Sequence, residues 1–169
     1  MRKWHQLAGR LAEPQFGGTH LGGGDAMSQP AGREAETQRA MALAKASYER
    51  CSATQEFFRA FYDDFFARCP EAKPRFANTD FDRQNKLLRH AIGLLLIFPG
   101  HSPAEPSVLQ RIAERHSRRD LDIRPALYQP FLESLIATVR RYDPQCDPAT
   151  EQAWRETMGP GVAYMQGRY

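Results

Sequence analysis

The fold is indicated most strongly by one stretch of the chain, Phe61-Tyr62-Asp63-Asp64-Phe65-Phe66-Ala67-Arg68-Cys69-Pro70-Glu71-Ala72-Lys73-Pro74-Arg75-Phe76. Its first half continues an aromatic series that begins at Phe57 and Phe58, and these residues recur at the spacing of one helix face. So dense a stripe predicts a helix that faces a thick core. Pro70 and Pro74 then interrupt the helix, because proline lacks an N–H and clashes with the preceding turn. We therefore expect a short turn that ends at Phe76.

The remainder of the chain predicts further helices with apolar faces. One runs from about Glu34 to Cys51, one is capped by Asp80 or Asp82 and ends at Pro99-Gly100, one spans about Ser107 to Arg118, and two open at Arg124-Pro125 and Asp147-Pro148. No stretch alternates apolar and polar residues between convincing turns. The predicted class is therefore all-α.

The beginning of the chain differs from the rest in composition. Phe16-Gly17-Gly18 and Leu21-Gly22-Gly23-Gly24-Asp25 are rich in glycine and have no apolar period. We expect residues 1–37 to form a flexible tail and residues 38–169 to form one folded domain. Met27 is an alternative to Met1 as the translation start.

Composition excludes several classes of function. The net charge of the 169 residues is only +3, and the basic residues form no block, so nucleic-acid binding has no support. No apolar run is long enough to span a membrane, and the first residues lack the apolar centre of a secretory signal. The three cysteines have no metal-ligand spacing, and their odd number favours a reduced, cytoplasmic setting.

One histidine stands out by its position. His116 follows Ile112 by four residues and Leu109 by seven, which places it on the apolar face of a short helix. Imidazole is a good iron ligand, and a backbone carbonyl can orient its second nitrogen. A lone histidine on an apolar face is nevertheless more often structural. The surrounding residues must therefore indicate whether His116 is an iron ligand.

Those residues resemble bacterial haemoglobins and the globin part of flavohaemoglobins. Residues 61–76 follow the family's pattern of Phe-Tyr, Pro-Glu, Pro and a closing Phe. Residues 81–88 look like the start of its distal helix, and Ile112-Ala113-Glu114-Arg115-His116 looks like its proximal motif. Tyr128 and Trp154 fall where the last two helices each carry an aromatic residue. The resemblance covers Ala40 to Tyr169 and implies a globin fold, a three-on-three helical sandwich around a haem.

The resemblance also implies a role for individual residues. His116 would ligate the iron of haem b, Phe76 would stack on the porphyrin, and Tyr62 would face the bound gas. Gln84 and Leu88 would overhang the iron, with Arg83 or Leu87 as neighbouring alternatives to Gln84. One of Arg115, Arg118 and Arg119 is a candidate partner for a haem propionate.

The sequence departs from the family pattern at two places. Asn85 stands where proline often follows the distal glutamine. The last dozen residues hold no carboxylate, whereas flavohaemoglobin-like globins use a glutamate to make the proximal histidine electron-rich.

The implied ligands are oxygen, carbon monoxide or nitric oxide, and oxygen binding, storage or transport is the expected function. Nitric oxide dioxygenation would need an external reductase, because the chain has no flavin or nicotinamide motif. Gas sensing is a third possibility. A haem-free interaction module is a fourth, and His116 argues against it. The sequence leaves enzymatic activity and oligomeric state open.

Removal of residues 1–30 tests the predicted tail. A glycine-rich, aperiodic segment buries too little apolar area to offset its ordering entropy. We expect the shortened protein to keep its haem content, with a melting temperature within about 2 °C of the full chain, as for about 0.5 kcal/mol in a protein of this size. Absorption spectra and thermal melts measure both quantities. A large loss of either would show that the tail packs on the domain.

Overall fold

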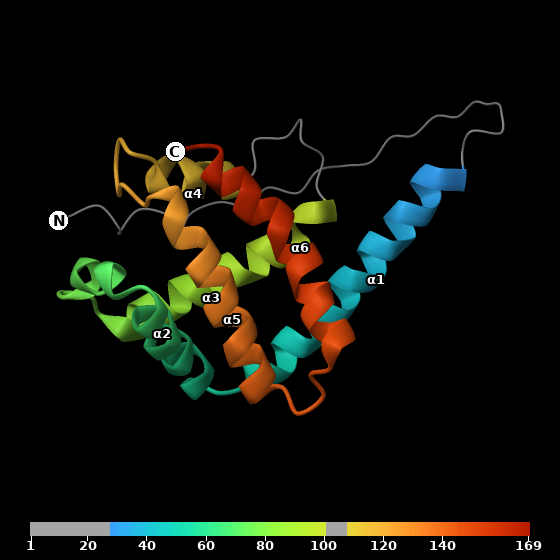
Figure 1. The fold of residues 1–169 in the computed structure, drawn as a ribbon, viewed down its shortest axis with the longest axis horizontal. Helices are drawn as coiled ribbons and strands as arrows, with labels where there is room; N and C mark the ends of the chain where they lie inside the picture. Colours follow the sequence, from blue (N-terminus) through green and yellow to red (C-terminus); the bar gives the residue numbers. More distant parts are fainter. Residues whose placement is uncertain (1–27, 101–107) are drawn as a thin grey trace.

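The computed structural model describes residues 28–100 and 108–169, and the elements within them are helices joined by turns (Figure 1). They are α1 (Ser28–Cys51), α2 (Glu56–Arg68), η1 (Pro70–Phe76), α3 (Phe81–Ile97), η2 (Phe98–Gly100), α4 (Val108–His116), η3 (Pro125–Leu127), α5 (Tyr128–Tyr142) and α6 (Pro148–Gln166). The predicted all-α class is confirmed. No described helix is long and apolar enough to cross a lipid bilayer.

The helix boundaries follow local chemistry. The carboxylate of Asp80 accepts hydrogen bonds from the backbone N–H of Asp82 and of Arg83, so Asp80 is the N-cap of α3. Asp147 caps α6 by accepting from the N–H of Thr150 at 2.7 Å, and Pro148 takes the first helical position. The break between α2 and α3 is the 3-10 helix η1, which begins at Pro70.

The first helix begins earlier than the sequence analysis expected. Residues 28–37, assigned there to the tail, are the first turns of α1. Side chains 31–36 are exposed, and burial on α1 begins at Ala40. The sequence pattern therefore located the start of packing rather than the start of the helix. The expectation for residues 1–27 lies outside the described residues.

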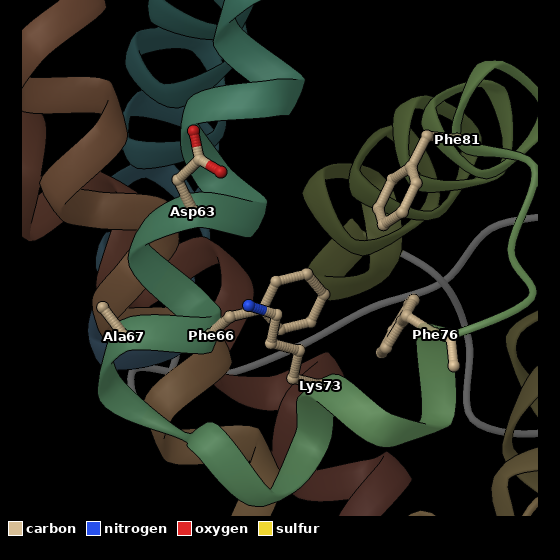
Figure 2. A pocket seen from close by; sticks show the side chains of 7 residues that line it. Asp63, Phe66, Ala67, Lys73, Phe76 and Phe81 are labelled. Carbon is tan, nitrogen blue, oxygen red and sulfur yellow. The ribbon is translucent and has the colours of Figure 1, made fainter.

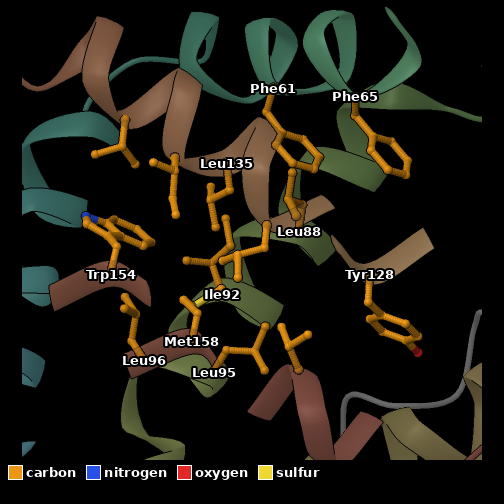
Figure 3. Packing of buried hydrophobic residues seen from close by; sticks show 14 of the residues in the cluster. Phe61, Phe65, Leu88, Ile92, Leu95, Leu96, Tyr128, Leu135, Trp154 and Met158 are labelled. Atoms are coloured by element: carbon orange, nitrogen blue, oxygen red, sulfur yellow. The ribbon is translucent and has the colours of Figure 1, made fainter. Parts of the chain in front are cut away.

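Two helix pairs build the body of the molecule. α1 packs against α6 and α2 packs against α5, and α3 passes behind α5 in the view of Figure 1. Their apolar faces meet in one core (Figure 3) that includes Phe61, Ile92, Leu135, Trp154 and Met158. The aromatic stripe of α2 lies inside this core as predicted.

The contact between α6 and α3 is close at Gly161. A Cβ added to Gly161 would lie 2.5 Å from Cδ2 of Leu95, which is closer than side-chain atoms approach. The absence of a side chain at Gly161 thus permits the spacing of the two helices.

Two polar contacts tie α1 to the other end of the chain. The buried indole of Trp154 donates a hydrogen bond from Nε1 to Oγ of Ser47 at 3.0 Å. The Arg50 guanidinium donates two hydrogen bonds to the buried carboxylate of Asp143, at 2.6 and 2.8 Å. These bonds from Arg50 lower the pKa of Asp143 to about 2. Asp143 follows α5 directly, so the pair fixes the turn that leads into α6.

Asp143→Asn tests this buried pair. The folded-state pKa of Asp143 lies below its ordinary value of 3.8, so the ion pair stabilises the fold above pH 4 and loses its effect as pH falls toward 2. We expect the variant to lose about 2–3 kcal/mol of unfolding free energy at neutral pH. Urea unfolding at several pH values measures the difference between variant and wild type. A difference that did not shrink between pH 4 and pH 2 would contradict the assignment.

Candidate functional site

A tyrosine and a glutamine from two different helices meet in the interior. Tyr62 of α2 is 5% exposed, and Nε2 of Gln84, on the first turns of α3, donates a hydrogen bond to its hydroxyl oxygen at 3.1 Å. Burial raises the pKa of Tyr62 to about 12, although the bond from Gln84 opposes this rise. The hydroxyl is therefore protonated at neutral pH. Because its oxygen accepts from Gln84, its own proton is available for another acceptor.

Three phenylalanine rings pack around the ring of Tyr62. The ring centroid of Tyr62 lies 5.8 Å from Phe66, 5.6 Å from Phe76 and 5.3 Å from Phe81. Figure 2 shows that Phe66, Phe76 and Phe81 come from α2, η1 and α3 and face a common space. This space is an open pocket of about 550 Å³, with Asp63 and Lys73 among its lining residues. The Tyr62–Gln84 pair is thus shielded by aromatic rings on the side of η1.

His116 is the last residue of α4, and its ring orientation is set by its own helix. Its Nδ1 lies 2.8 Å from the backbone oxygen of Ile112. A carbonyl oxygen only accepts, so Nδ1 carries the proton and donates it. Burial lowers the pKa of His116 below 6.5, which favours the neutral ring. In this tautomer Nε2 has a free lone pair, which is what metal ligation requires.

The loop after α4 is hydrogen-bonded back to the end of that helix. The N–H of Leu121 donates to the carbonyl oxygen of Arg115 at 3.0 Å, and the N–H of Ile123 donates to that of His116 at 2.9 Å. Within the described residues, no three His, Cys, Asp or Glu side chains group to hold a metal ion. A haem iron differs from such ions, since the porphyrin supplies four ligands and one histidine suffices.

The structure brings some of the predicted site residues into direct contact. Tyr62 touches both Gln84 and Phe76, which makes Gln84, rather than a neighbour, the residue that reaches the tyrosine. Leu88 lies one turn beyond Gln84 and is buried. Within the described part of the chain, His116 forms no hydrogen bond or ring contact with these four residues. It lies on α4, which packs against α3, so the two halves of the predicted site are on neighbouring helices.

Two features of the site escaped the sequence analysis. Phe81 packs against Tyr62 although its side chain is 40% exposed. Its position three residues before Gln84, on the same face of α3, is the signal that would have found it. Arg75 contacts the loop after His116, and no sequence pattern links residues so far apart. Among the arginines predicted as partners of a haem propionate, Arg115 forms an ion pair with Asp120, with its Nε 3.5 Å from Oδ2.

The comparisons with known proteins identify the family to which the fold belongs. The family model described as Globin matches residues 59–165. A protein from Pseudomonas aeruginosa, whose crystal structure is described as highly homologous in structure to a human haemoglobin, is 38% identical. The match covers 77% of this chain and 98% of that chain, with a TM-score of 0.72. No curated protein matches the chain.

These matches confirm the predicted globin fold and the resemblance to bacterial globins. The residues present also fit a haem: a neutral histidine offers Nε2, and a buried hydroxyl keeps a proton to donate. The helical fold agrees with a family match over more than half of the chain, and the chain belongs to the globin family, whose members typically bind haem.

Proposed function

We propose that this protein binds haem b through Nε2 of His116 and binds oxygen reversibly on the opposite face. The observation that carries the proposal is the hydrogen bond from Nδ1 of His116 to the oxygen of Ile112, because it directs the second nitrogen away from the helix as a free ligand. When bound, the haem supplies an iron with one position open to a diatomic gas.

On the proximal side, His116 supports oxygen binding better than oxidative chemistry. Its Nδ1 donates to a neutral carbonyl rather than to a carboxylate, so the ring gains little extra electron density. The lowered pKa of His116 favours an unprotonated Nε2, so a proton competes less with iron. A histidine whose second nitrogen has no carboxylate partner suits reversible binding.

On the distal side, Tyr62 is the donor that would meet the gas. A hydrogen-bond donor at this place would favour oxygen over carbon monoxide, because oxygen would gain more negative charge as a ligand of ferrous haem. The oxygen of the Tyr62 hydroxyl accepts a hydrogen bond from Gln84. The hydroxyl hydrogen therefore stays free to form a hydrogen bond with the ligand. Leu88 and Phe76 would exclude water and hold the porphyrin.

His116→Ala and His116→Gly test haem ligation. We expect both variants to lose most of their haem, and added imidazole to restore it in His116→Gly by replacing the missing ligand. His90→Ala is the matched control, because His90 is exposed on α3. Haem content and the Soret band report the result. An unchanged Soret band and iron–histidine signature in the variants would remove the proposal.

Tyr62→Phe tests the distal donor. One hydrogen bond in a dry pocket is worth on the order of 1–3 kcal/mol. We therefore expect oxygen to dissociate roughly 10- to 100-fold faster, with carbon monoxide dissociation changed much less. Gln84→Leu should act in the same direction but more weakly.

Tyr142→Phe provides the control for this substitution, because Tyr142 lies at the far end of α5. Stopped-flow ligand replacement measures the dissociation rates. Wild-type rates for both gases in Tyr62→Phe would make Tyr62 a core residue only.

Two other uses of the same site remain alternatives to oxygen storage. Nitric oxide dioxygenation would use the same distal donors together with a separate reductase, and gas sensing would need a partner for the signal. Nitric oxide consumption with and without an added reductase separates the first of these from storage. A cytoplasmic location is consistent with the free thiols of Cys51, Cys69 and Cys146.

A further inference from the structure

We propose that Arg75, Asp122 and Tyr169 form a clasp that joins the two sides of the haem site and slows the loss of haem. This inference rests on the proposed function, because it takes Phe76 and His116 to lie on opposite faces of the porphyrin. The clasp itself is drawn from contacts between residues far apart in the sequence.

The first half of the clasp comes from the distal side. Arg75 immediately precedes Phe76 in η1. Its Nη1 donates a hydrogen bond to the backbone oxygen of Leu121 at 3.0 Å, and its Nη2 lies 3.5 Å from Oδ2 of Asp122. One side chain therefore holds both the backbone and a carboxylate of the loop that follows α4.

The second half comes from the end of α6. The hydroxyl of Tyr169 donates a hydrogen bond to Oδ1 of Asp122 at 2.7 Å. The Arg118 guanidinium lies 5.1 Å from the Tyr169 ring centroid, in a cation–π contact. Figure 1 shows the end of the chain beside α4. The hydroxyl of Tyr169, and after it Arg75, lowers the pKa of Asp122, so the carboxylate stays charged.

The loop transmits the contact to the proximal histidine. Asp122 lies between Leu121 and Ile123, whose N–H groups bond to the carbonyl oxygens of Arg115 and His116. Asp122 also has a φ of 51°, in the left-handed region that, among residues other than glycine, asparagine and aspartate adopt most readily. Displacement of Asp122 would therefore disturb the two hydrogen bonds that connect this loop to the end of α4.

On this proposal, haem release requires the turn that carries Phe76 to separate from the segment that carries His116. Such a separation breaks the contacts of Arg75 with Leu121 and Asp122. The side chains of Arg75 and Asp122 are 36% and 41% exposed, so each contact is weak and screened by salt. The clasp should therefore change the rate of opening more than the stability of the fold.

The test measures haem transfer from the holoprotein to an excess of apomyoglobin. We expect Asp122→Asn, Arg75→Gln and Tyr169→Phe to release haem roughly 3- to 10-fold faster, as the loss of one or two exposed polar contacts would allow. Arg75→Lys keeps the charge and should recover part of the rate. Salt at 1 M should accelerate release from the wild type but not from Asp122→Asn.

Asp64→Asn is the matched control, because Asp64 forms an exposed ion pair with Arg68 within α2 that bridges no two parts of the site. Urea unfolding of the haem-free variants detects a general loss of stability. The clasp is overturned if Asp122→Asn releases haem at the rate of the wild type, or if stability falls in parallel with the rate. A wild-type protein that takes up no haem would instead overturn the proposed function itself.

Discussion

Burial of the aromatic face of α2 is the constraint on which the rest of the structure depends. Phe57, Phe58 and Phe61 are almost fully buried, and each contributes about 1.5–3 kcal/mol by leaving water. A helix with so large an apolar face has one stable orientation, with that face against α5 and the core. Tyr62 follows Phe61 and turns with it, so the orientation that buries the phenylalanines also places the tyrosine hydroxyl opposite Gln84.

The same desolvation that stabilises the core prepares the polar groups of the site. Burial raises the pKa of Tyr62 and lowers that of His116, and both changes favour the neutral form. A neutral tyrosine donates a hydrogen bond, and a neutral histidine offers a lone pair. One physical effect thus produces a donor and a ligand of opposite character. Partners on the chain decide which atom of each is free: Gln84 for the hydroxyl and the Ile112 carbonyl for the imidazole.

The ion pairs divide into two kinds by their surroundings. The Asp143 carboxylate is buried and receives two hydrogen bonds from Arg50, so its removal leaves a cation without its partner in a partly buried place. The carboxylate of Asp122 is shared between Arg75 and Tyr169 at the surface, where water and salt weaken each contact. The buried pair of Arg50 and Asp143 is suited to holding helices in place. The exposed pair of Arg75 and Asp122 is suited to a contact between segments that would separate and close again.

The sequence by itself determined the local features of this protein. Apolar periodicity located the helices, proline placed the break after α2, and the order of Tyr62, Phe76, Leu88 and His116 indicated the family. These signals can be recognised in the sequence alone because they come from residues that are close together along the chain. Some positions stayed open for the same reason: Asp80 and Asp82 are both good caps.

Only the tertiary structure decided the remaining features. Which residue at the start of α3 reaches Tyr62 depends on how α2 and α3 cross, and the structure gives Gln84 that contact. The close contact at Gly161 exists only because the Leu95 side chain of another helix lies against it. Arg75, Asp122 and Tyr169 are separated by more than forty residues at each step, and no periodicity connects them. Contacts between distant segments depend on the packing of the whole core, which no local pattern of residues contains.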